Sequence, residues 1–128
     1  MSENHADTRP LVLIIDDDLA VRESLTEVME AFGFRTSTAA NGLEGLVSIA
    51  LEAPSAIITD LQMPRMSGLE LITALRHTKT GIPVIVISGS TSTDLAKARQ
   101  MGAAAAFHKP LPVFEMIDAV NGLTRIAA

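Results

Sequence analysis

Short apolar runs alternate with stretches of helical periodicity from residue 11 onward. Nearly unbroken apolar runs at Leu11–Ile15, Ala56–Thr59 and Val84–Ile87 predict strands buried on both faces, as in a parallel sheet. A short last strand is expected at Ala105–His108. The segment Phe34–Thr38 is β-prone but polar, so it predicts a strand at the edge of the sheet.

Five helices are expected after these strands, because apolar residues recur there at helical spacing. The first helix is expected to end at Gly33, since glycine readily adopts the left-handed conformation found at helix ends. The fourth, Thr93–Met101, has the weakest pattern. The pattern in the other four is carried by Val21, Leu25, Val28, Met29 and Phe32; by Leu43, Leu46, Val47 and Ala50, before Pro54; by Leu69, Leu71, Ile72 and Leu75; and by Val113, Phe114, Met116, Ile117 and Val120.

Five strand–helix units predict an α/β fold of the flavodoxin-like, doubly wound kind. Its sheet would have five parallel strands, right-handed crossovers and helices on both faces. The polar second strand belongs at an edge, which the strand order 2-1-3-4-5 provides. A chain of 128 residues fits one domain, predicted over residues 11–126. The polar residues 1–10 are expected to form a flexible tail.

Composition narrows the class of protein. With 48% hydrophobic residues, the chain has enough apolar material for a core, which excludes disorder throughout. A net charge of -5, without basic clusters, gives no electrostatic footprint for nucleic acid or a membrane surface. The absence of cysteine excludes disulfides and thiolate chemistry. With no secretory pattern and no membrane-length apolar run, a cytoplasmic location is expected.

Polar residues follow four of the predicted strands. Asp16–Asp18 come after the first strand, Asp60 and Ser88 after two central strands, and Lys109 after the last. Ligands of open parallel sheets bind at this carboxyl edge. Any one such residue could simply cap a helix, and Asp18 is the best candidate for a plain cap. Together, crowded carboxylates call for a cation such as Mg²⁺, and the lysine and hydroxyl suit a phosphoryl group.

Four segments resemble the receiver domain of bacterial response regulators. They are IIDDDLAVR, IITDLQMPRMSGLEL, PVIVISGS and GAAAAFHKP, in that order. The resemblance spans roughly Arg9 to Arg125, and it is specific because the four motifs occur together.

The resemblance implies a role for each matching residue. Asp60 would be the phosphoacceptor, a carboxylate nucleophile that forms an acyl phosphate. Asp16 and Asp17 would form the acidic pair, with Asp17 binding Mg²⁺ directly and Asp16 acting mainly through water. Asp60 and the backbone carbonyl of Gln62 would complete the protein ligands. Ser88 would be the switch hydroxyl that closes on the phosphoryl group.

The resemblance also covers the supporting residues and the partners. Lys109 would pair with a phosphoryl oxygen, and with Asp60 before phosphorylation. The Lys109–Pro110 bond would be cis, and Pro64 and Gly68 would shape the loop after Asp60. The expected donor is a phosphohistidine on a histidine kinase or a histidine phosphotransfer protein. The domain would catalyse only its own phosphorylation and dephosphorylation, and would signal to a downstream partner or output domain.

Ala106 departs from the family pattern. Receivers usually carry Tyr or Phe three residues before the lysine, and that ring moves with the switch hydroxyl. Phe107 is no simple substitute, because successive strand residues face opposite sides of a sheet. We therefore expect phosphorylation to survive and the signal to leave through the Ser88 loop and the fourth helix.

Three other functions fit parts of the pattern. A pseudo-receiver would keep the fold as an interaction module without taking phosphate, and only Ala106 favours it. A small Mg²⁺-dependent phosphohydrolase of the haloacid dehalogenase type would use Asp16 and Asp18, but Ala20 stands where that class has Thr or Val. A nucleotide or flavin binder would need a glycine-rich phosphate loop after the first strand, which is missing.

Overall fold

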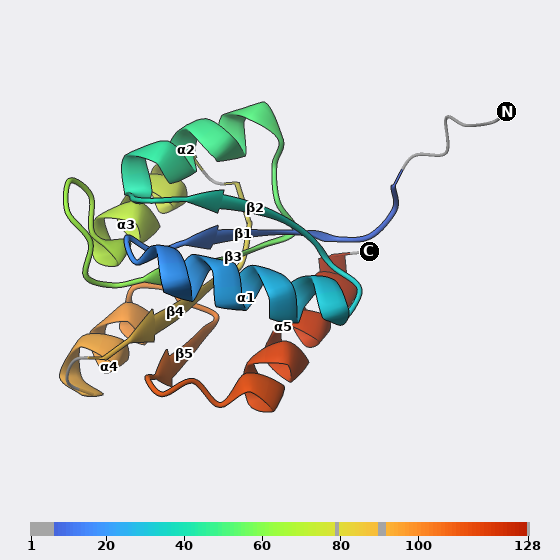
Figure 1. Cartoon of the computed structure of the whole chain (residues 1–128). Coiled ribbons are helices and arrows are strands. Elements are labelled where there is room, and N and C mark those ends of the chain that lie inside the picture. The colour runs from blue at the N-terminus through green and yellow to red at the C-terminus, as the bar shows by residue number, and fades with distance from the viewer. Residues whose placement is uncertain (1–6, 79, 90–91, 128) are drawn as a thin grey trace, which may run out of the picture.

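The computed structural model describes residues 7–78, 80–89 and 92–127, which fold around one parallel sheet (Figure 1). The strand order is β2-β1-β3-β4-β5, as predicted, so the polar strand β2 lies at an edge. The strands are β1 (Leu11–Ile15), β2 (Arg35–Ala39), β3 (Ala56–Asp60), β4 (Val84–Ser88) and β5 (Ala105–His108).

Helices cover both faces of the sheet, as the alternating pattern predicts. One face packs against two helices, α1 (Leu19–Ala31) and α5 (Val113–Ala127). The other packs against α2 (Gly42–Leu51), α3 (Gly68–Thr78) and α4 (Ser92–Gln100). None of the helices in the described ranges is both long and apolar enough to span a membrane.

The three central strands form the middle of the core. Every residue of β1, β3 and β4 is buried, which confirms the interpretation of their apolar runs. Alternate residues face opposite layers: Leu13 packs toward α3, whereas Ile14 packs toward α1 and α5. This sheet is the rigid support on which the polar residues of its carboxyl edge are fixed.

Helix α1 begins and ends as its sequence indicates. The Asp18 carboxylate accepts the amide of Ala20 at 2.9 Å, which makes Asp18 the predicted N-cap. At the other end Gly33 has a φ of 96°, in the left-handed region. The amide of Phe34 then reaches back to the carbonyl of Met29 at 3.0 Å and closes the helix.

Helix α2 is present, but only part of its apolar pattern reaches the core. Leu43 and Val47, two of the four residues that carried the periodic pattern, are 46% and 62% exposed. Leu46 and Ile49 pack against the core, but the fully buried residues are Gly42 and Gly45, with Gly45 placed against Ile15 of β1. Without a side chain, Gly45 lets α2 lie close to the sheet and Gly42 lets it lie close to Met66, contacts that hydrophobic periodicity does not register.

Phe114 of α5 is also outside the core that its spacing predicted. It is 74% exposed, and its ring meets Phe32 edge to face with the centroids 6.3 Å apart. Met116, Ile117 and Val120 do reach the core as expected.

Strands β3 and β4 extend one residue further than predicted, so Asp60 and Ser88 are strand residues, and β2 is shifted one residue toward the C-terminus. The proposed tail, residues 1–10, lies mostly outside the described residues, and its flexibility stays a prediction.

Candidate functional site

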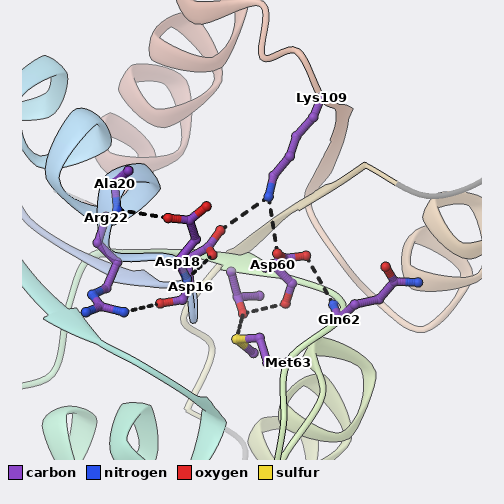
Figure 2. Close-up of polar contacts among 9 residues, drawn as sticks. Asp16, Asp18, Ala20, Arg22, Asp60, Gln62, Met63 and Lys109 are labelled. Atoms are coloured by element: carbon purple, nitrogen blue, oxygen red, sulfur yellow. Dashed lines mark hydrogen bonds and ion pairs between the residues drawn. The ribbon is translucent and has the colours of Figure 1, made fainter.

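The predicted site residues meet at the carboxyl edge of the sheet. Ser88 ends β4, paired in register with His108 of β5, directly before Lys109. Ile87 of β4 is paired with Asp60 of β3. Because the strands are parallel and adjacent, their ends present these side chains at one rim. Figure 2 shows Asp60 and Lys109 facing each other there.

Asp16 is completely buried at this rim and both carboxylate oxygens have partners. Its Oδ1 accepts the amide of Asp18 at 2.9 Å, and its Oδ2 lies 3.5 Å from Nζ of Lys109. Its backbone is held as well, because the amide donates to the carbonyl of Ala39 at 3.1 Å. Asp16 is therefore fixed between β2 and the first turn of α1.

Asp60 is 7% exposed, so its carboxylate is accessible only from the rim. Oδ1 accepts the amide of Gln62 at 3.1 Å, and Oδ2 lies 3.2 Å from Nζ of Lys109. The Lys109 ammonium thus bridges two carboxylates that come from β3 and the end of β1 (Figure 2).

Burial and charge act against each other in this cluster. Burial raises the pKa of Asp16, and the neighbouring charge of Asp60 raises it further, more than the Asp18 amide and Lys109 lower it. Burial alone would lower the pKa of Lys109, but the negative charges of Asp60 and Asp16 outweigh burial and raise it. The site therefore holds more negative charge than one lysine balances.

The acidic cluster fits a hard divalent cation. Asp16, Asp17 and Asp60 each offer a carboxylate oxygen, and these atoms all lie within 4.8 Å of one another. The donor set is entirely oxygen, as Mg²⁺ requires. Asp17 is exposed where the other two are buried, so the cluster opens toward solvent on its side. The residues present thus fit the magnesium that the sequence predicts.

Ser88 and the lysine segment lie where the sequence places them. Ser88 is completely buried at the end of β4, and its carbonyl accepts the amide of Lys109 at 2.8 Å. The Lys109–Pro110 bond is cis, as the family resemblance implies. The hydrogen bond from the Lys109 amide to the Ser88 carbonyl holds the backbone of Lys109 next to Ser88.

The loop after Asp60 brings Gly68, the first residue of α3, back against the backbone of Asp60 and Leu61. The amide of Gly68 donates to the carbonyl of Leu61 at 2.9 Å, and the helix α3 starts there. A Cβ on Gly68 would lie 2.6 Å from the carbonyl oxygen of Asp60, so only glycine fits. Pro64 lies exposed in this loop, and the Gln62 side chain is exposed too.

Ala106 and Phe107 point to opposite layers, as strand alternation predicts. Ala106 is half-buried on the side of α3 and α4, whereas Phe107 packs on the side of α1 and α5. The phenyl ring of Phe107 therefore does not replace the missing aromatic residue at Ala106.

One residue of the site was missed in the sequence. Arg22 of α1 donates from Nη1 to the carbonyl of Asp16 at 2.6 Å. A basic residue in the first turn of α1, shortly after a strand-end aspartate, was a signal that could have been used, because helical side chains tilt toward the N-terminus and a long arginine can reach the preceding turn.

Comparison with known proteins agrees with this geometry. The chain is 37% identical over 119 residues to the transcriptional regulatory protein PrrA of Mycobacterium tuberculosis, covering 92% of this chain and 51% of PrrA. It is 33% identical over 111 residues to sporulation initiation phosphotransferase F of Bacillus subtilis, covering 86% of this chain and 90% of that protein. The chain thus spans about half the length of its mycobacterial relatives.

A solved structure and a family match complete the comparison. The fold is similar to the Francisella response regulator 1452 receiver domain, with a TM-score of 0.88 and 28% identity, covering 94% of this chain and 100% of that one. Residues 12–121 match the family described as the response regulator receiver domain. With this match over most of its length, the chain belongs to the response regulator receiver domain family.

Proposed function

We propose that this receiver takes a phosphoryl group on Asp60 from a phosphohistidine of a histidine kinase or histidine phosphotransfer protein. The observation that carries the proposal is the position of Lys109, whose ammonium group contacts Asp60 and Asp16 inside the acidic cluster. The phosphotransferase named among the relatives supports the same chemistry.

The transfer needs one bond to form and one to break. A carboxylate oxygen of Asp60 attacks the phosphorus, and the bond between phosphorus and the donor's histidine nitrogen breaks, leaving its electron pair on the imidazole. Lys109 is placed to neutralise a phosphoryl oxygen, since its ammonium group already faces Asp60 at 3.2 Å. The amide of Gln62 holds the other oxygen of Asp60 and so orients the nucleophile.

The acidic residues would hold Mg²⁺, with Asp16 acting mainly through water, Asp17 and Asp60 binding it directly, and the Gln62 carbonyl as a further ligand. When bound, this ion would neutralise charge on the phosphoryl oxygens. Asp16 keeps its orientation from the Asp18 amide and from burial.

The signal would leave through Ser88 and the segment up to Met101. Ser88 ends β4 and α4 begins at Ser92, and on this proposal the Ser88 hydroxyl would donate to a phosphoryl oxygen. Ala106 has no aromatic ring that could move together with the Ser88 hydroxyl. On this proposal the domain turns over nothing but its own aspartyl phosphate, and a downstream partner or output domain reads the change. The cytoplasmic location expected from the sequence stays a prediction.

The test is phosphorylation by acetyl phosphate, followed by intact mass, with and without Mg²⁺. We expect one Mg²⁺-dependent phosphoryl adduct that is lost in Asp60→Asn. Asp18→Asn is the matched control, because it removes a neighbouring exposed carboxylate while asparagine keeps the helix cap. That control should be phosphorylated like the wild type.

Two results would contradict the proposal in different ways. The absence of an adduct under every condition would favour a pseudo-receiver. An adduct that survives Asp60→Asn but disappears in Asp16→Asn would favour a phosphohydrolase that uses the first strand end.

A further inference from the structure

Arg22 makes an unusual contact with the acidic turn that follows β1. It is half-buried on α1, and its guanidinium group turns back across the start of the helix to the Asp16 backbone (Figure 2). The Nη1 atom lies 2.6 Å from the carbonyl oxygen, a short charge-assisted hydrogen bond. Lys109 approaches the same residue through its carboxylate instead.

The Asp16 carbonyl needs this donor. Asp16 is completely buried, and a buried carbonyl without a partner is costly. Neither neighbouring amide serves the Asp16 carbonyl. The amide of Asp16 donates to the carbonyl of Ala39, and the amide of Asp18 donates to the Asp16 carboxylate. The guanidinium is the donor that reaches the carbonyl, which fixes the peptide between the two aspartates of the acidic pair.

The contact also leaves the carboxylates of the acidic turn without Arg22 as an ion-pair partner. Within the part of the chain that the structure describes, no carboxylate lies within ion-pair distance of Arg22, although Asp16, Asp17 and Asp18 are close to it in sequence. A second cation on these oxygens, in addition to Lys109, would compete with a metal ion for them. A cation on the backbone supports the turn without occupying its ligands.

We propose that Arg22 is a positioning residue for the metal site: it orients the Asp16–Asp17 peptide so that both carboxylates face a bound divalent cation. The inference rests on the proposed function, because that function supplies the magnesium. It assigns Arg22 a role in cation affinity, beyond its contribution to folding.

Charge and positioning predict opposite effects, which makes the inference testable. If Arg22 acted only as a nearby positive charge, removing it would tighten the binding of Mg²⁺. If it positions the ligands, removing it weakens binding, since residues that orient ligands typically contribute roughly 10-fold or more to metal affinity. Because this oxygen-only site opens to solvent at Asp17, we expect the low end of that range, about 10-fold.

The substitution is compatible with folding. Arg22 lines an open hollow of about 460 Å³ between α1 and β2, so a shorter side chain leaves no closed cavity there. Arg22→Gln keeps a polar group and good helix propensity. Arg22→Lys keeps the positive charge and one donor nitrogen, and serves as the conservative variant if Arg22→Gln fails to fold.

The experiment is an NMR titration of the protein with MgCl₂ alone, following the backbone amides of Asp17, Asp18 and Gln62. Arg76→Gln is the matched control: that arginine also donates to a carbonyl, that of Met101, at 2.9 Å, but it lies in the last turn of α3. Thermal unfolding without metal is measured in parallel, so that loss of stability and loss of affinity are separated.

We expect Arg22→Gln to weaken Mg²⁺ binding, Arg22→Lys to recover part of the affinity, and Arg76→Gln to bind like the wild type. Unchanged or tighter binding in Arg22→Gln, with the wild type still binding Mg²⁺, would overturn the role of Arg22 and leave the proposed function intact. Failure of the wild type itself to bind Mg²⁺ would overturn both.

Discussion

The ammonium nitrogen of Lys109 lies 3.2 Å from Oδ2 of Asp60, although 49 positions separate the two residues in the chain. Strand β4 lies between the strands that carry them, so the lysine side chain reaches across the end of a neighbouring strand. The same nitrogen lies 3.5 Å from Asp16. The Lys109 ammonium group therefore partly balances the negative charge of two carboxylates, those of Asp60 and Asp16.

Replacing Lys109 by methionine should destabilise the metal-free protein at neutral pH. The raised pKa of Lys109 means that its charged form is favoured by folding, a contribution that is complete at neutral pH and is lost as the pH rises through that raised pKa. Without it, two buried carboxylates repel each other, and we expect a loss of about 1–3 kcal/mol. Chemical unfolding in EDTA measures this.

Added Mg²⁺ should recover part of the stability lost in Lys109→Met, because a bound cation replaces the missing charge. Lys97→Met is the matched control, an exposed lysine on α4 away from the rim. Equal stability of the two variants in EDTA would show that the bridge of Lys109 contributes nothing to folding.

Replacing Asp16 by asparagine should stabilise the metal-free protein at neutral pH. Burial raises the pKa of Asp16, so folding favours its neutral form. Stability from this group is complete below its unfolded value of 3.8 and is lost as the pH rises through the higher folded value. We therefore expect a higher melting temperature for Asp16→Asn at pH 7 in EDTA, and a difference that shrinks as the pH falls toward the unfolded value.

Circular dichroism melts at a series of pH values would follow this effect. Asp18→Asn, which changes an exposed carboxylate in the same turn, should melt like the wild type at each pH. A lower melting temperature of Asp16→Asn at neutral pH would mean that its pairing with Lys109 outweighs burial.

Two glycine-to-alanine changes should have opposite signs. In Gly68→Ala the new Cβ would lie 2.6 Å from the Asp60 carbonyl oxygen and 2.9 Å from the Leu61 Cα, both backbone atoms. We expect a loss of roughly 1–3 kcal/mol from overpacking, together with slower phosphorylation because the phosphoacceptor strand must shift. Urea unfolding and acetyl phosphate kinetics test this.

Gly122→Ala is the second of these changes and serves as the control for Gly68→Ala. Gly122 lies within α5, and a Cβ added there would meet nothing within 4 Å, so alanine should stabilise the helix by about 0.5–1 kcal/mol. A Gly68→Ala variant as stable as Gly122→Ala would contradict the close contact at the start of α3.

Phosphorylation should shift the backbone amides of residues 88–101 and leave those near Phe107 almost unchanged. The reason is that Ala106 provides no ring to couple the Ser88 loop with β5, and Phe107 packs in the opposite layer. Two-dimensional NMR before and after acetyl phosphate measures both regions. Unchanged shifts at 88–101 in a protein that is fully phosphorylated would exclude this route for the signal.

The sequence by itself determined the fold and the chemistry of the site. The runs at β1, β3 and β4 predicted buried parallel strands, and the polar β2 predicted the edge. Such patterns are local: a strand buried on both faces must be apolar throughout, wherever it lies in the sheet. The carboxyl-edge rule then brought Asp16, Asp60 and Lys109 together without any distance being known.

Only the tertiary structure decided which side of α2 is buried and what holds the acidic turn. The periodic pattern placed Val47 in the core, but close packing through Gly42 and Gly45 leaves it exposed. The bond from Arg22 to the Asp16 carbonyl was likewise hidden, because it joins a side chain to a backbone atom. Hydrophobic spacing records which residues avoid water, whereas these contacts depend on how closely each helix approaches its neighbours, which is set when the helices pack on the sheet.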